Sequence, residues 1–121
     1  MNERLNTLRF NYKIWLESED GENLLGDGKW RLLQAVEETG SLKGAMEKLN
    51  LSYRKTWDNL NKIEEKLGFN LITRVRGGIE GGSTTLTEEG KIIVKAFKQF
   101  HVLHDQLFKQ SCEEVMKSFT N

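Results

Sequence analysis

Hydrophobic and polar positions change their period several times along the chain, and each period predicts a type of element. From Leu8 to Leu16 apolar and polar residues alternate strictly, the period of two that is typical of a half-buried strand. The dipeptide Asp20-Gly21 then favours a tight turn, and residues 23–25 can form a short return strand. We therefore expect an N-terminal β-hairpin over residues 8–25.

The next stretch, residues 27–40, is apolar over a broad face, with Trp30 and Val36 among its members. That breadth predicts a helix buried in the core. Asp27 is the expected N-cap of this helix. Gly40 suits its end, because glycine adopts the left-handed backbone that often terminates helices.

Two short amphipathic helices joined by a tight turn are expected over residues 41–67. Ser41 and Ser52 are good N-cap residues for them, and Asn50 tolerates the left-handed backbone of the turn. This order is typical of a helix-turn-helix. Side chains expected to face inward from the second of these helices are Tyr53, Trp57, Leu60, Ile63 and Leu67.

The opposite face of that second helix concentrates cations in its first turns. In a helix-turn-helix this part enters the major groove, and Arg, Lys and Asn suit contacts with base edges and phosphates. Taken alone, the pattern is also compatible with an ordinary helical hairpin that has a solvated charged face. Asp58 is expected to accept a hydrogen bond from cytosine or to order its neighbours Arg54 and Lys62. The outward residues are Arg54, Lys55, Asp58, Asn59, Asn61 and Lys62.

A strand, a glycine-rich loop and a returning strand are expected next, over residues 71–86. A phosphate-binding P-loop would need Lys-Ser/Thr after its last glycine and a helix directly behind it. Here Ser83 follows Gly82 without a lysine, and Thr84-Thr85-Leu86 resembles a strand. We therefore expect a wing whose backbone approaches phosphates closely.

Thr87 is the expected N-cap of a last helix, which no Gly or Pro interrupts from Lys91 to the end of the chain. At 1.5 Å per residue, roughly 25–30 residues would be about 40 Å long, more than a domain this small can cover. A second copy of the chain is the simplest partner for its apolar stripe, and a frayed tail after residue 110 is the alternative. Expected dimerisation residues are Ile93, Phe97, Phe100, Leu103 and Leu107.

Composition and charge limit the class of protein. The 121 residues suffice for one domain, and neither a membrane-spanning run nor a secretory signal is recognisable. Cys112 is the single cysteine, so we expect a buried thiol and a reducing, cytoplasmic setting. Net charge is zero, yet residues 41–86 carry eight cations against five anions and residues 1–40 carry five against eight. That asymmetry favours a weakly basic face.

Nothing in the sequence assembles a catalytic set, so we expect no enzyme and no cofactor. His101 and His104 lie three residues apart on the last helix. Two histidines alone make an incomplete zinc site, so we expect no metal and place both at the surface or an interface.

Two segments resemble the N-terminal DNA-binding domain of the molybdate-dependent (ModE-type) regulators, winged-helix relatives of the LysR-type regulators. They are TGSLKGAMEKLNLSYRKTWDNLNKIEEKLG and RGGIEGGSTTLTEEGK, and the resemblance runs from about Tyr12 to Leu107. The family pattern has a recognition helix opening with Ser-Tyr-basic-x-x-Trp-acidic, then two glycine pairs before Leu-Thr-x-x-Gly. Its matches here are Ser52, Tyr53, Arg54, Trp57, Asp58, Gly77, Gly78, Gly81, Gly82, Leu86, Thr87 and Gly90.

The resemblance implies a mainly α fold with a small β part (α+β): a winged helix-turn-helix with an N-terminal β-hairpin and a long C-terminal dimerisation helix. Residues 1–86 would be the DNA-binding domain and residues 87–121 the dimerisation helix. Trp57 would set the angle of the recognition helix from the core, and the wing would lie on the backbone or in the minor groove. Expected DNA-binding residues are Ser41, Lys43, Ser52, Tyr53, Arg54, Lys55, Asp58, Lys62, Arg74, Arg76, Gly77, Gly78, Gly81 and Gly82.

Two departures from the family pattern matter. The family wing often carries a lysine between its glycine pairs, whereas this chain has Ile79-Glu80, and Glu80 would repel phosphate. The oxyanion-binding domain of full-length regulators is absent from these 121 residues, so we expect them not to sense molybdate directly.

The function expected from the sequence is that of a cytoplasmic, homodimeric transcription regulator. It would bind double-stranded DNA in molybdate- or tungstate-related gene control, either constitutively or with a separate effector protein. The alternative is a winged-helix interaction or accessory module of molybdenum or tungsten metabolism that does not bind DNA.

Overall fold

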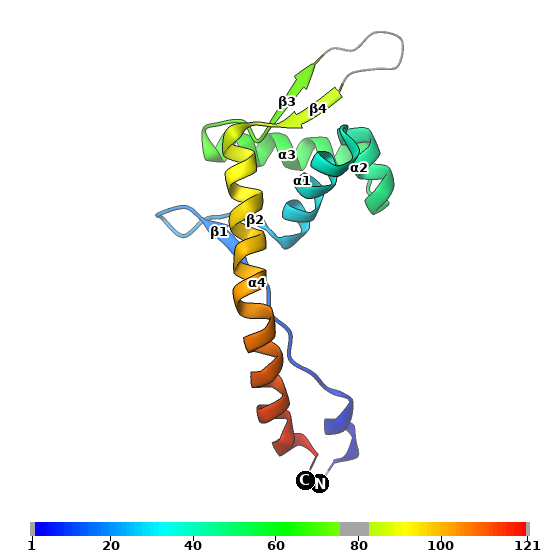
Figure 1. Ribbon diagram of the computed structural model, residues 1–121, viewed down its shortest axis with the longest axis vertical. Helices are drawn as coiled ribbons and strands as arrows, with labels where there is room; N and C mark the ends of the chain where they lie inside the picture. Colours follow the sequence, from blue (N-terminus) through cyan, green and yellow to red (C-terminus); the bar gives the residue numbers. More distant parts are fainter. Residues whose placement is uncertain (1, 76–82, 121) are drawn as a thin grey trace.

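A long helix and a cluster of shorter elements make up the protein (Figure 1). The computed structural model describes residues 2–75 and 83–120. The shorter helices gather at one end, and the long helix α4 runs away from them toward the place where the two ends of the chain lie together. The elements are η1 (Glu3–Thr7), β1 (Trp15–Glu17), β2 (Asn23–Gly26), α1 (Asp27–Thr39), α2 (Leu42–Leu49), α3 (Tyr53–Leu67), β3 (Ile72–Val75), β4 (Ser83–Leu86), α4 (Glu88–Met116) and η2 (Lys117–Phe119).

Helix α1 lies at the centre of the core and packs against α2, α4, β2 and β4. Its broad apolar face makes this possible, because Leu32, Leu33 and Val36 are completely buried. Leu60 of α3 and Leu71, just before β3, are buried to the same degree. The prediction of a buried first helix is confirmed.

Local capping fixes the helix-turn-helix as predicted. The Ser41 hydroxyl accepts a hydrogen bond from the Gly44 amide at 2.9 Å, and the Ser52 hydroxyl accepts one from the Lys55 amide at 3.4 Å. Asn50, between the two helices, has a left-handed backbone with φ 55° and ψ 50°. Because these bonds satisfy the first amides of α2 and α3, the start of α3 is set by sequence-local interactions.

Asp27 does not cap α1, so that prediction is wrong. Gly26 occupies the N-cap position without a side-chain hydrogen bond, and Asp27 is the first helical residue. The Asp27 carboxylate instead accepts a hydrogen bond from the Ile14 amide at 3.4 Å and lies 3.0 Å from the His101 ring. Tertiary partners have replaced the local capping role.

The predicted strand from residue 8 is also wrong over most of its length. Only Trp15–Glu17 pairs with β2, in antiparallel register. We call residues 8–14 the N-terminal arm. Phe10 packs against Phe119 with ring centroids 5.8 Å apart, and Tyr12 packs against Phe108 of α4 at 4.4 Å. Within the arm only Tyr12 and Ile14 are half-buried, whereas Leu8 and Phe10 are exposed, so an irregular and partly covered segment can show the period of two of a strand.

The predicted wing strands are confirmed, with Ile72 opposite Leu86 in an antiparallel pair. Buried Glu64 of α3 accepts hydrogen bonds from the amides of Leu71 and Ile72 at 2.7 and 3.3 Å. Thr87, the N-cap of α4 as predicted, donates its hydroxyl to the Asn70 carbonyl at 2.7 Å. These bonds tie the root of the wing to α3 and α4.

Helix α4 spans 29 residues without interruption, so the prediction of a long last helix is confirmed and no frayed tail begins at residue 110. Its first half belongs to the core: Phe97 is only 3% exposed, which corrects its assignment to a dimer surface. Ile93 packs against the same core. Cys112 is half-buried, not fully buried as expected.

Candidate nucleic-acid interface

The start of α3 presents polar side chains to solvent. Ser52, Arg54 and Lys55 are exposed, while Thr56 and Leu60 on the other side of the helix are buried. Trp57 is half-buried and packs against the core, in agreement with its expected part in setting the angle of the helix. The core therefore holds one face of α3 and leaves its N-terminal face accessible to a partner.

Tyr53 faces solvent, which corrects its prediction as an inward residue. Its side chain is 60% exposed, and its ring meets Trp57 edge-to-face with centroids 6.2 Å apart. Helix α3 begins at Tyr53, before its first buried residue Thr56, so this ring lies beyond the edge of the core. The exposed ring agrees with the contact to DNA that the family resemblance implies.

Cations on this face differ from other cations of the same two helices. Lys66 lies 3.0 Å from Glu22, and Lys48 is paired with Glu38. Exposed cations without a carboxylate partner are free to contact phosphate. Within residues 2–75 and 83–120, no ion pair involves Lys43, Arg54, Lys55, Asp58 or Lys62.

Asp58 is exposed on α3 and does not form the ion pairs with Arg54 and Lys62 that one interpretation expected. Its other expected role, accepting from cytosine, stays a prediction. Ser41 is half-buried and its hydroxyl caps α2, whereas Lys43 is exposed. The wing candidates lie outside the described residues; they are the side chain of Arg74 together with Arg76, Gly77, Gly78, Gly81 and Gly82.

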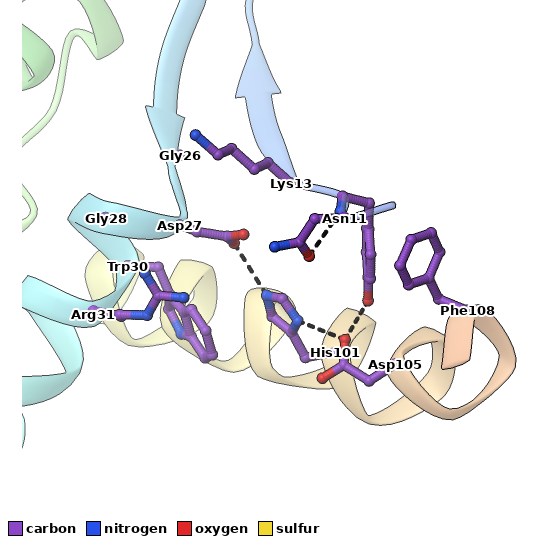
Figure 2. A pocket seen from close by; sticks show the side chains of 11 residues that line it. Asn11, Lys13, Gly26, Asp27, Gly28, Trp30, Arg31, His101, Asp105 and Phe108 are labelled. Atoms are coloured by element: carbon purple, nitrogen blue, oxygen red, sulfur yellow. Dashed lines mark hydrogen bonds and ion pairs between the residues drawn. The ribbon is translucent and has the colours of Figure 1, made fainter. Parts of the chain in front are cut away.

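A second polar site lies far from this face, beside the middle of α4. A pocket of about 940 Å³ is lined by the N-terminal arm, the start of α1 and α4; Figure 2 shows the side chains that line it. The His101 ring lies inside it, with Nε2 3.0 Å from Asp27 Oδ1 and Nδ1 2.9 Å from Asp105 Oδ1. The Tyr12 hydroxyl donates to the same Asp105 oxygen. We call Tyr12, Asp27, His101 and Asp105 the clasp.

The clasp shifts the titration of its members. Hydrogen bonding to Asp105 raises the pKa of His101, with a further contribution from Asp27 and partial opposition from desolvation. The Tyr12 hydroxyl, and then His101, lower the pKa of Asp105. In return, the hydrogen bond to Asp105 raises the pKa of Tyr12 to about 12. The three shifts favour a charged imidazole, an ionised carboxylate and a protonated phenol.

Sequence reasoning missed the clasp. His101 and Asp105 lie four residues apart on one helix, a spacing at which side chains meet, and that signal was available. Asp27, in contrast, is 74 residues from His101, and no local pattern predicts that contact. His101 is half-buried, with 17% of its side chain exposed, rather than the surface or interface residue expected. His104 is exposed.

Among the residues that the structure describes, no three or more His, Cys, Asp and Glu side chains gather as a metal would require. In the same residues no helix combines the length and apolar character needed to cross a bilayer.

A capped, exposed helix start beside a two-stranded wing defines the protein as a winged helix-turn-helix module. The model of the family "Bacterial regulatory helix-turn-helix protein, lysR family" matches residues 28–91, from α1 through the wing to the first turn of α4. The chain belongs to this family.

Similar proteins carry names from molybdenum biology. "Molybdenum transport protein ModE" from Azotobacter vinelandii is 31% identical over 107 residues, covering 88% of this chain and 39% of the relative. "Transcriptional regulator ModE" from Haemophilus influenzae is 29% identical over 84 residues, covering 63% and 33%. "DNA-binding transcriptional dual regulator ModE" from Escherichia coli K12 is 28% identical over 82 residues, covering 61% and 31%. The chain thus spans less than two fifths of each of these relatives.

A solved structure supports the fold. The crystal structure of ArgP from Mycobacterium tuberculosis matches with a TM-score of 0.53 and 20% identity, over 69% of this chain and 29% of that one. The chain resembles the N-terminal DNA-binding domain of ModE-type regulators, as the sequence predicted. The alternative of an accessory module without DNA binding is not favoured, because these relatives are named as regulators.

Proposed function

We propose that this chain acts in the cytoplasm as a homodimeric, DNA-binding transcription regulator in molybdate-related gene control. The observation that carries the proposal is the start of α3. There Ser52 caps the helix, and Arg54 and Lys55 are exposed without an ion-pair partner among the described residues. The relatives named as DNA-binding regulators support the same assignment.

DNA contact would follow the usual helix-turn-helix geometry. The first turn of α3 would enter the major groove, where Arg54 and Lys55 can reach guanine or phosphate. Tyr53, 60% exposed, would offer its ring to a thymine methyl or its hydroxyl to a phosphate. Lys43 and Lys62 would add phosphate contacts, which supply much of the affinity and make it depend on salt.

Dimerisation would use the far half of α4. Phe100, Leu103 and Leu107 are 50%, 64% and 57% exposed, and α4 runs well beyond the cluster of short helices (Figure 1). A second α4 is the partner that would cover this apolar surface symmetrically. Two recognition helices would then address half-sites about 34 Å apart, one turn of the duplex.

The decisive experiment selects duplexes from a random library with the purified protein and measures affinity at two salt concentrations. We expect enrichment of a palindrome and an affinity that falls steeply with salt. Arg54→Ala should weaken binding by about 1–3 kcal/mol and relax specificity at one position if Arg54 reads a base. A uniform loss over all sequences would make Arg54 a phosphate contact instead.

Lys117→Ala is the control, because Lys117 is an exposed cation directly after α4 that pairs with Glu114, whereas Arg54 lies in the first turn of α3. It removes the same charge and should leave DNA affinity unchanged. Binding no tighter than about 10⁻⁴ M, the weak end of non-specific contact, would contradict the proposal and favour a protein partner. Sedimentation of Leu103→Asp, expected to be monomeric, tests the dimer surface separately.

A further inference from the structure

The geometry of the clasp is satisfied by a charged histidine. Both ring nitrogens of His101 face carboxylate oxygens, Nε2 toward Asp27 at 3.0 Å and Nδ1 toward Asp105 at 2.9 Å. A neutral imidazole has one N–H donor and one lone pair, whereas the imidazolium has two donors. Between two ionised carboxylates, only the imidazolium satisfies both contacts. A neutral ring would turn one lone pair toward a carboxylate oxygen.

Of the other groups around the ring, Trp30 favours that charge and the neighbouring cations oppose it. The Trp30 ring stacks on the His101 ring, with centroids 4.7 Å apart and planes inclined by 15°, a geometry in which a cation interacts favourably with an aromatic face. Trp30 is itself held by a hydrogen bond from its indole N–H to the Val94 carbonyl at 3.2 Å. The cations Lys13 of the arm and Arg31 of α1 also line the pocket (Figure 2) and act against a positive charge on the ring, while His104 acts electrostatically on Asp105.

Three parts of the chain meet at this ring. Asp27 belongs to α1, and its other oxygen accepts the Ile14 amide at the end of the arm. Asp105 belongs to α4 and accepts the Tyr12 hydroxyl from the arm. The N–H on Nε2 therefore joins α4 to α1 directly, and the N–H on Nδ1 orients Asp105, the acceptor of the Tyr12 hydroxyl of the arm.

We propose that His101 is a positioning residue: its protonated imidazole holds the arm and α4 against α1, and loss of the proton releases the arm and frees the angle of α4. This inference rests on the proposed function for its consequence. The angle between α1 and α4 sets the separation of two recognition helices in a dimer, so releasing the clasp weakens binding to paired half-sites. Binding to a single half-site needs only one recognition helix and is therefore unaffected.

The first test needs no DNA. Ring-proton NMR of the full chain gives the pKa of His101, and amide exchange at residues 10–14, corrected for intrinsic rates, reports release of the arm. We expect His101 to titrate above about 6.5, the ordinary histidine value, and exchange to rise through the same transition. A His101 pKa at or below that value overturns the proposal, and so does an amide exchange rate at residues 10–14 that does not change as His101 titrates.

Variants separate the charge from the shape of His101. His101→Gln is neutral at every pH, so the arm should exchange rapidly throughout, whereas His101→Arg keeps a permanent cation and should protect the arm at alkaline pH. His104→Gln is the matched control, since His104 is exposed three residues away and stacks on Phe100; it should behave as the wild type. Asp105→Asn, similar in size to the native residue, replaces His101→Gln if that variant does not fold. Wild-type protection of the arm in His101→Gln, or in Asp105→Asn where it replaces that variant, overturns the proposal.

DNA binding supplies the second readout. With the duplex selected by the wild-type protein, His101→Gln should lose about fivefold or more in affinity, the low end of coupling between separate sites. A duplex that carries one half-site should show no loss. If amide exchange of the arm depends on pH but the protein binds no duplex, the proposed DNA-binding function fails, whereas the proton-dependent release of the arm is supported. If wild type and His101→Gln bind the paired half-sites equally well across pH, the clasp does not set the separation of the two recognition helices, and that part of the proposal is overturned.

Discussion

At the start of α3 a tyrosine ring and two cations are exposed to solvent, whereas at the clasp a tyrosine hydroxyl and a histidine ring contact carboxylates of the same chain. Tyr53 is 60% exposed, and Arg54 and Lys55 have no ion-pair partner among the described residues. His101 lies between Asp27 and Asp105. The same residue types are thus placed for contact with another molecule in one region and for internal contact in the other.

This difference shows what to ask of a charged group. A cation that is paired with a carboxylate of the same protein fixes the relative position of elements, so its removal should lower the free energy of unfolding. Removal of a cation without such a partner should change the free energy of unfolding little. Its effect should appear in the affinity for DNA. The predictions below follow from that contrast, from the largest expected effect to the smallest.

Trp30→Ala should lower the free energy of unfolding by about 3 kcal/mol, the low end for loss of a large aromatic side chain because the ring is half-buried. The change removes stacking on both Phe97 and His101. Chemical denaturation measures it. Tyr53→Ala, which removes an aromatic ring at the other region, should change the same quantity by no more than about 0.5 kcal/mol. Equal losses in the two variants would contradict the contrast.

Gly90→Ala should lower the free energy of unfolding by about 1–3 kcal/mol, as overpacking does. A Cβ at Gly90 would lie 2.3 Å from the Leu71 carbonyl oxygen, at the joint between the wing and α4. Gly28→Ala is the control, because no atom lies within 4 Å of a Cβ there. Thermal unfolding of the two variants tests the joint, and an unchanged melting temperature for Gly90→Ala would show that the backbone moves apart freely.

The Tyr53→Ala variant should show its main effect on DNA. We expect an affinity loss of about 1–2 kcal/mol for the selected duplex, within the range of a good contact to a base. Tyr53→Phe distinguishes the two possible contacts, since it keeps the ring for a thymine methyl and removes the hydroxyl. Titration of both variants at one fixed salt concentration measures the effect. Wild-type affinity in Tyr53→Ala would remove Tyr53 from the interface.

The pH dependence of stability should also distinguish the clasp. Because the folded-state pKa of His101 is raised, its contribution is complete below the unfolded value of about 6.5 and is lost as pH rises through the folded value. The pKa of Asp105 is lowered, so its contribution is lost as pH falls through that lowered value. Denaturation of wild type and His101→Gln at several pH values should give curves that converge at alkaline pH. Parallel curves would contradict this.

The sequence predicted the helix-turn-helix and the wing because their signals are local. Ser41, Asn50, Ser52 and Thr87 each act within a few residues of their own position, and the structure places all four in the capping and turn positions expected. The strands β3 and β4 were recognisable for the same reason, since they lie close together in the sequence. Local backbone chemistry was sufficient wherever the partner of a residue was near in sequence.

The failures share the opposite cause. The alternation at residues 8–14 indicates apolar contacts on one side of the chain, but it does not say whether a strand or a helix makes them. Asp27 has the chemistry of an N-cap, yet a histidine 74 residues away competes for its carboxylate. Tyr53 keeps the helical period but lies beyond the edge of the core. In each case the deciding contact depends on tertiary packing.

The length of α4 turns small changes of angle into displacement. The half of the helix beyond His101 reaches Met116, which at 1.5 Å per residue makes a rod about 22 Å long. A tilt of about 10° at the clasp would move the far end of such a rod by about 4 Å, close to the rise of one base pair. The loss of one proton at His101 would therefore change the spacing of the two recognition helices along DNA, because the length of α4 amplifies a small change of angle.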